Sequence, residues 1–242
     1  MSATSAFAPV SLLCLPCAGA SATMYLRWRR LLPSWVRLVA VELPGRGARM
    51  GEPLVRDFNE QVQRLCDEQQ QALQGRYALF GHSMGALLAH GIARRQHALA
   101  RPVPGALFVS ASPAPARRDP ARFAGLDNRQ ALLDDMRRQG GTPAEVFDNE
   151  ELLGLTLSVL SADYQVCASF RPEVGLPLDM PVHAFGGRQD DIAPDAIEAW
   201  REATRAPSAV HWFDGGHFYL RGHEPMVLKH LVLGLSEAFP DV

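Results

Sequence analysis

The sequence predicts a single α/β domain, with a mainly parallel, doubly wound sheet and a helical insertion. Its 242 residues suit one such domain, which commonly reaches this length. Hydrophobic residues make up 47% of the chain and charged residues 21%, as in globular proteins, which excludes disordered, collagen-like and coiled-coil chains. Short apolar runs alternate with longer segments of helical period, as expected when helices cover both faces of a parallel sheet.

Six apolar runs have the length of a strand. They are Val10–Leu15, Arg37–Leu43, Arg76–Phe80, Ala106–Ser110, Pro181–Gly186 and Ala209–Phe213. Four segments with apolar residues at helical spacing follow strands: Asp57–Leu73, a helix around Leu87–Ala93, Ala196–Thr204 and Pro225–Phe239. Alternation of this kind is what a doubly wound sheet requires.

The interval Pro113–Leu178 interrupts this alternation, because it contains no clear strand but has helical patterns at Asp127–Gln139 and Asn149–Val166. An interval of this length is too long for an ordinary loop. Its apolar residues at helical spacing argue against disorder. We therefore expect residues 113–178 to form a helical lid over a site within a single domain, 1–242; the alternative is a packed extra layer without a gating role.

Charge and composition narrow the partners and the location. With 24 basic and 26 acidic residues the net charge is −2, so the chain lacks the basic field that attracts nucleic acid. No run approaches the 18 or so apolar residues of a spanning helix, and no basic residue precedes the first apolar run, Pro9–Ala20. We expect no nucleic-acid partner, no membrane crossing and a cytoplasmic location. Nothing in the pattern sets an oligomeric state.

The chain has four cysteines, too few for a disulfide scaffold. Cys14 and Cys17 have the spacing of a redox pair or of half a zinc site. Because no second pair completes a tetrahedral ligand set, we expect no metal, and the redox or zinc use stays an alternative.

Gly81-His82-Ser83-Met84-Gly85 is a G-x-S-x-G motif between a predicted strand and a predicted helix. In that context the motif makes a tight, strained turn that exposes the serine, and small residues two positions to either side prevent a clash. We expect Ser83 to be a nucleophile rather than part of a turn without a chemical role.

A serine hydroxyl needs a histidine base and an acid that holds the histidine, which follow in the order serine, acid, histidine in the α/β-hydrolase fold. His217 lies in Asp214-Gly-Gly-His, on a glycine-flanked loop after the last strand, where the base is needed. Asp190 and Asp191 follow the strand Pro181–Gly186. The pattern does not separate these two carboxylates, and both could instead cap the next helix.

An oxyanion needs two backbone donors, one from the residue after the nucleophile and one from the loop after the first strand. The Met84 amide fits the first position. Ala18, in a turn of small residues, fits the second, because a close backbone approach tolerates little side-chain bulk.

Several motifs, spread over nearly the whole chain, resemble those of the type II thioesterases that accompany nonribosomal peptide and polyketide synthetases. The similar segments are Leu13–Ala20, Glu42–Arg49 with its L-P-G-R, Gly81–Ala86, Gly140–Pro143, Asn149–Leu152, Ser161–Tyr164, Phe185–Asp190 and Gly215–Phe218. Four positions depart from the family pattern: Cys17, Ala20, Ser161 and Asp191.

The resemblance implies the α/β-hydrolase fold and selects Asp190 over Asp191, because the family pattern is G-G-x-x-D. It also implies that the Ala18 and Met84 amides form the oxyanion hole. The implied reaction is release of acyl or aminoacyl groups from the phosphopantetheine arm of carrier proteins, which clears misprimed or stalled synthetases. The chain itself would bind no cofactor. The alternative is a carboxylesterase or lipase-like serine hydrolase acting on small esters. Arg117, Arg118 and Arg122 could attract an acidic carrier protein or could simply be solvated.

Overall fold

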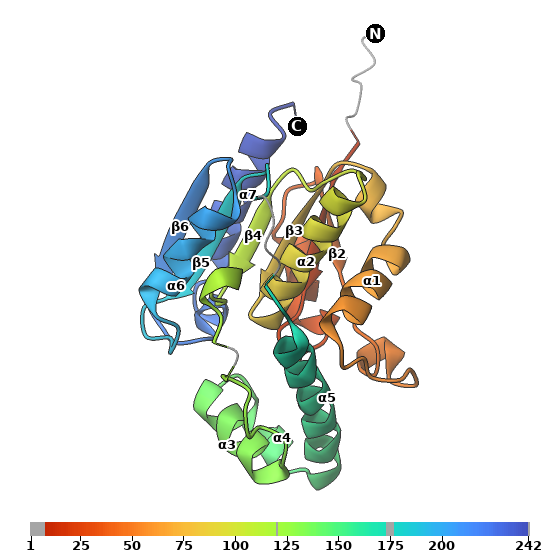
Figure 1. Ribbon diagram of the computed structural model, residues 1–242, viewed down its shortest axis with the longest axis vertical. Coiled ribbons are helices and arrows are strands. Elements are labelled where there is room, and N and C mark those ends of the chain that lie inside the picture. Colours follow the sequence, from red (N-terminus) through yellow and green to blue (C-terminus); the bar gives the residue numbers. More distant parts are fainter. Residues whose placement is uncertain (1–7, 120, 173–176, 242) are drawn as a thin grey trace.

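The computed structural model describes residues 8–119, 121–172 and 177–241. A sheet of six parallel strands forms its centre, in the order β2-β1-β3-β4-β5-β6 (Figure 1). The strands are β1 (Val10–Leu15), β2 (Val36–Ala40), β3 (Tyr77–His82), β4 (Leu107–Ser110), β5 (Val182–Gly187) and β6 (Ser208–Phe213). The prediction of a parallel α/β sheet is confirmed, and the described sheet contains parallel pairs throughout.

The inner strands are apolar along their length because helices bury both faces of the sheet. In β1, Leu13 and Leu15 join one apolar cluster, whereas Leu12 and Cys14 join the cluster on the opposite face. Successive side chains of a strand point to opposite faces, so a strand buried on both faces reads as a continuous apolar run. This is why the inner strands could be located from the sequence.

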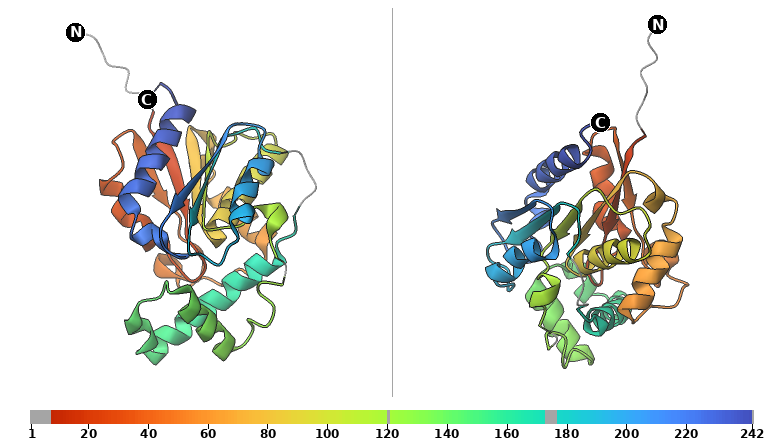
Figure 2. Two further views of the ribbon diagram at one scale, coloured as in Figure 1. Left: turned by 90° about the vertical axis from the view of Figure 1, so that its left-hand side faces the viewer. Right: turned by 45° about the horizontal axis from the view of Figure 1, so that its top comes forward.

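Helices cover the two faces of the sheet. On one face lie α1 (Phe58–Glu68), α2 (Met84–Ala98), α6 (Pro194–Glu198) and the 3-10 helix η5 (Ala199–Ala203); on the other lie η1 (Ala22–Arg30) and α7 (Glu224–Ala238) (Figures 1 and 2). Asp57 caps α1, since its side chain accepts a hydrogen bond from the Glu60 amide. Short 3-10 turns complete the connections at Gly47–Arg49, Ala72–Gln74, Pro115–Arg117 and Tyr219–Arg221.

The insertion between β4 and β5 is a small helical layer at the carboxyl edge of the sheet, at the end remote from both termini (Figures 1 and 2). It contains α3 (Arg129–Gln139), α4 (Ala144–Phe147) and α5 (Glu150–Ser169). Leucines of α3 and α5 form a third apolar cluster there with Met136 and Tyr164. Further along α5, Val166 and Cys167 belong instead to the main core. Of the predicted insertion, positions 120 and 173–176 lie outside the described residues.

Helix α5 is the one described helix that is long and apolar enough to cross a membrane by length and composition. Inside this molecule 44% of its most apolar window is buried. Its apolar side chains pack in the third cluster and in the main core, which accounts for its composition.

Several predicted boundaries differ from the structure. The second strand ends at Ala40 rather than Leu43, and the chain then turns at Pro44 and Gly45, which has a φ of +77°. The helix predicted to reach Leu73 ends at Glu68. About half of the segment Ala196–Thr204 is 3-10 helix. Neither η1 nor α4 was predicted, since neither has a clear apolar period.

Candidate active site

Ser83 occupies the sharp turn between β3 and α2, with a φ of +56° and a ψ of −115°. A Cβ added to Gly81 would lie 2.0 Å from the carbonyl oxygen of Gly85, and one added to Gly85 would lie 2.1 Å from that of Leu15. Both positions therefore require glycine, because backbone atoms cannot give way as side chains can. The turn has the strained geometry that the motif predicts, with the serine at its apex.

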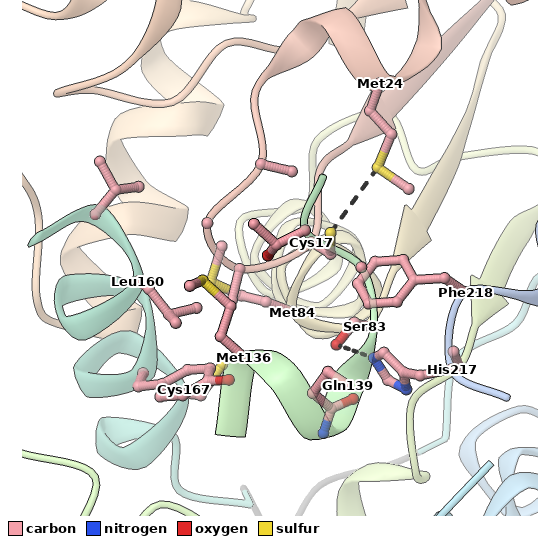
Figure 3. A pocket seen from close by; sticks show the side chains of 18 of the residues that line it. Cys17, Met24, Ser83, Met84, Met136, Gln139, Leu160, Cys167, His217 and Phe218 are labelled. Atoms are coloured by element: carbon pink, nitrogen blue, oxygen red, sulfur yellow. Dashed lines mark hydrogen bonds between the residues drawn. The ribbon is translucent and has the colours of Figure 1, made fainter. Parts of the chain in front are cut away.

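The structure brings Ser83, His217 and Asp190 together. His217 Nε2 lies 2.9 Å from Ser83 Oγ (Figure 3). On the other side of the ring, His217 Nδ1 lies 2.9 Å from Asp190 Oδ2. A carboxylate only accepts hydrogen bonds, so Nδ1 carries the proton and Nε2 is free to accept the serine hydroxyl. The histidine side chain is 13% exposed and the aspartate side chain 5%, so water screens this pair little.

The loops that carry the acid and the base are bonded to each other. The backbone N–H of Gln189 donates to the Gly215 carbonyl at 3.0 Å, and the backbone N–H of Gly215 donates to the side-chain oxygen of Gln189. A Cβ on Gly187 would lie 2.6 Å from the carbonyl oxygens of both Gly215 and Gly216. Glycine at this position thus permits the close approach of the two loops that sets the distance between Asp190 and His217.

Asp191 points elsewhere: its side chain is 69% exposed and pairs with Arg138 of α3. The residue before α6 is Ala193, which makes no side-chain cap, so neither aspartate caps that helix. The choice that the motif pattern left between the two carboxylates falls on Asp190 by geometry as well as by resemblance.

His82 lies beside the ring of His217, a neighbour of the site that the sequence analysis did not identify. It is fully buried, and its ring lies 5.4 Å from that of His217. His82 Nδ1 lies 2.8 Å from Ser110 Oγ, which lies 2.6 Å from the Tyr219 hydroxyl. Burial holds the pKa of His82 well below its usual value, so a neutral imidazole packs against the base. Its position inside the G-x-S-x-G motif was the available signal.

The remaining histidines do not reach Ser83. They are His90 and His97 on α2, His183 in β5, His211 in β6, His223 before α7 and His230 on α7.

Ala18 and Met84 both line the cavity beside Ser83. Met84 is the first residue of α2, so its amide has no intrahelical acceptor and lies at the positive end of the helix dipole. Ala18 lies in the turn between β1 and η1, and the next amide, of Gly19, is already engaged by Asp163 Oδ2 at 2.8 Å. The arrangement can present two backbone N–H groups to an oxyanion.

A cavity of about 1220 Å³ lies between the Ser83 turn and the insertion. Figure 3 shows Ser83 and His217 on one side of it and Met136, Leu160 and Cys167 on the other. The wall contributed by α3 and α5 is mainly apolar near these side chains, which suits the hydrocarbon part of an acyl group.

The cysteines do not have the character of a redox or metal site. All four are free thiols and buried. Burial raises the pKa of Cys17 to about 12 and that of Cys14 well above its usual value, so both stay protonated, whereas thiolates are the reactive and metal-binding form. Within the described residues no group of three or more His, Cys, Asp or Glu side chains could hold a metal ion.

The three arginines at the start of the insertion already have partners. Arg117 pairs with Glu202 at 3.2 Å, Arg122 pairs with Asp135 at 3.0 Å, and Arg118 lies over a phenylalanine ring. The charges of Arg117 and Arg122 are partly balanced within the molecule, which weakens these arginines as an attractive surface for an acidic partner.

A family model described as "Thioesterase domain" matches residues 10–232. The gramicidin S biosynthesis protein GrsT of Aneurinibacillus migulanus is 32% identical over 216 residues, which cover 88% of this chain and 84% of GrsT. Thioesterase PikA5 of Streptomyces venezuelae is 35% identical over 216 residues, or 87% of this chain and 75% of PikA5.

Among solved structures, the type II thioesterase BorB from the borrelidin biosynthetic cluster has a TM-score of 0.86 at 36% identity and covers 94% of this chain and 93% of its own. The RedJ thioesterase from the prodiginine pathway of Streptomyces coelicolor has a TM-score of 0.86 at 33% identity, and the match covers 95% of this chain and 91% of the RedJ chain. Both the resemblance to type II thioesterases and the α/β-hydrolase fold are confirmed. The chain therefore belongs to the thioesterase family and is a hydrolase.

Proposed function

We propose that this thioesterase releases acyl or aminoacyl groups from the phosphopantetheine arm of carrier proteins, clearing misprimed or stalled arms. The observation that carries the proposal is the Ser83–His217–Asp190 hydrogen-bonded set, which opens onto a large cavity with two backbone amides beside it. The kind of partner is suggested by relatives such as YbtT and ClbQ, which belong to nonribosomal peptide and polyketide pathways.

The first half of the reaction transfers the acyl group to the enzyme. His217 Nε2 takes the proton from Ser83 as Oγ attacks the thioester carbonyl carbon, and Asp190 stabilises the imidazolium. The amides of Ala18 and Met84 hold the oxyanion of the tetrahedral intermediate. When the C–S bond breaks, the imidazolium returns its proton to the departing thiolate, which leaves as the free phosphopantetheine thiol.

Water completes the cycle. His217 takes a proton from a water molecule that attacks the ester carbonyl of the acyl-enzyme, and the same two amides hold the second oxyanion. Collapse of that intermediate breaks the C–O bond, Ser83 recovers its proton from His217, and the free carboxylic acid departs. The phosphopantetheine belongs to the substrate protein, so the chain itself needs no cofactor for either half.

The helical insertion would act as a lid in this scheme. Met136 of α3 and Leu160 of α5 face the cavity opposite Ser83, where they can contact the acyl chain and displace water from it. The cytoplasmic location expected from the sequence belongs to the same proposal and is checked by fractionating cells that express the tagged chain.

The test is a panel of purified carrier proteins loaded with acetyl, aminoacyl and longer acyl groups, compared with matched small oxygen esters. Wild type should release the groups from the carrier, and Ser83→Ala should not, because no hydroxyl remains to form the acyl-enzyme. Asp191→Asn serves as the control for a substitution at the rim of the site. Turnover of oxygen esters without release from any carrier protein would favour the carboxylesterase alternative and overturn the proposal.

A further inference from the structure

Two motifs that the catalytic set does not use meet inside the molecule. Arg46, from the L-P-G-R segment after β2, and Asp163, on α5 of the insertion, form a bidentate ion pair with distances of 2.6 and 2.7 Å. Their side chains are only 7% and 2% exposed. Burying two charges is costly unless they are paired and further hydrogen-bonded, so both groups should have additional partners.

Those additional partners lie in one place, the turn that carries Ala18. Asp163 Oδ2 accepts a hydrogen bond from the Gly19 amide at 2.8 Å. Arg46 Nη1 donates to the Ala20 carbonyl at 3.2 Å. The ion pair therefore holds the turn at two successive residues, through the N–H of Gly19 and the C=O of Ala20.

The held turn sets the direction of the neighbouring amide. Gly19 has a φ of +76°, a conformation that a flexible glycine would readily leave if nothing held it. The bonded Gly19 N–H belongs to the peptide unit that follows Ala18, so this hydrogen bond restrains the ψ angle of Ala18 and the φ angle of Gly19, and with them the turn on which the Ala18 N–H lies. Amides of an oxyanion hole act only when aimed at the reacting oxygen.

We propose that Arg46 and Asp163 are positioning residues, which fix the Ala18 amide and couple it to helix α5. This rests on the role of the Ala18 amide in the proposed function. The pair does not touch the reacting atoms, so its removal should lower kcat and leave KM nearly unchanged. A purely structural ion pair would instead affect the amount of folded protein.

Removing one partner alone would strand a buried charge and could unfold the chain, whereas replacing both with apolar side chains is often tolerated. Two double variants therefore separate the roles: R46M/D163L and R46M/D163N. Leucine and asparagine have nearly the shape of aspartate, but only asparagine keeps an oxygen that can accept from the Gly19 amide. The two variants differ only at the end of side chain 163, where asparagine offers an acceptor oxygen and an NH2 group and leucine offers neither.

The assay is hydrolysis of a small acyl thioester of N-acetylcysteamine, followed by release of its thiol, together with the melting temperature. This substrate needs the oxyanion hole whether or not carrier proteins are the partners, so failure here is distinct from failure of the proposed function. We expect kcat of R46M/D163L to fall about tenfold or more, with KM little changed, and R46M/D163N to recover most of the loss.

An exposed ion pair of the same insertion, Arg129–Glu150, provides the control. R129M/E150L should leave kcat unchanged. Equal kcat in folded R46M/D163L and wild type would reduce the pair to a structural element, and equal loss in both double variants would remove the acceptor role of Asp163. If a double variant does not fold, Arg46→Lys keeps the carboxylate paired and bonded to the Gly19 amide but loses the bidentate contact; an unchanged kcat in that variant overturns the positioning role of Arg46.

Discussion

Replacing Asp190 with asparagine is the sharpest test of the catalytic set, because Asp191 beside it offers a matched control. Asparagine has the shape of aspartate but carries no charge, and its amide can donate a hydrogen bond to His217 Nδ1. That donation favours the tautomer with the proton on Nε2, which cannot accept the proton of Ser83.

The size of the effect follows from the burial of the pair. The carboxylate is 5% exposed and lies 2.9 Å from the imidazole nitrogen. For charge centres about 4 Å apart, at an effective dielectric constant of about 20, the attraction that stabilises the imidazolium is about 4 kcal/mol. Each ~1.4 kcal/mol is a factor of ten in rate. Together with the wrong tautomer, the loss in kcat should be about 10³- to 10⁴-fold.

Thiol release from a small acyl thioester measures this loss over a wide range of enzyme concentration. Asp191→Asn removes the same charge one residue away, but from a side chain that is 69% exposed and pairs with Arg138. It should change kcat by less than about threefold, because exposed ion pairs contribute little. A larger loss in Asp191→Asn than in Asp190→Asn would refute the assignment of the acid.

Four further substitutions test the site and the stability of the fold. Gly85→Ala places a Cβ 2.1 Å from the Leu15 carbonyl oxygen and should lower both the activity and the melting temperature. Its control is Gly154→Ala in α5, where the added Cβ meets open space and should stabilise the protein by about 0.5–1 kcal/mol. Equal melting temperatures of these two variants would contradict the prediction. Burial, and to a smaller extent the nearby histidines, lowers the pKa of His211 to about 4. Between this pKa and the ordinary value of about 6.5, the unfolded chain binds a proton at His211 that the folded chain does not. The free energy of unfolding should therefore fall as the pH drops from about 6.5 to 4. Urea titrations across that range should show a shallower fall for His211→Asn. Cys17→Ala should hydrolyse thioesters at the wild-type rate, and loss of activity would revive a role for the thiol.

Much of the fold could be predicted because the physical causes are local. The inner strands are short apolar runs, as expected for strands that are buried on both faces of a sheet. Helices α1 and α3 are preceded by Asp57 and Asn128, whose side chains cap the first turn. The 3-10 helix η1 escaped prediction because its buried residues, Tyr25 and Trp28, stand among arginines without a clear period. Tertiary packing on the sheet, rather than its own pattern, gives that segment its structure.

The catalytic set was predictable for a different reason, namely the fixed position of parallel strand ends. Ser83, Asp190 and His217 each follow a strand, so they meet at one edge whatever the chain between them does. The support around them was not predictable from pattern. The ion pair of Arg46 and Asp163 depends on where an insertion folds back, which no spacing along the chain encodes.

Helix α5 limits how the enzyme can admit a substrate. Its last turns are secured to the body of the molecule: Val166 and Cys167 lie in the main core, and the Ser169 hydroxyl accepts a hydrogen bond from the Phe58 amide at 2.8 Å. This part of the helix cannot move away from the sheet without disrupting the packing of the main core. We therefore expect any widening of the cavity to come from α3, α4 and the first turns of α5, while the turn that carries Ala18 keeps its shape.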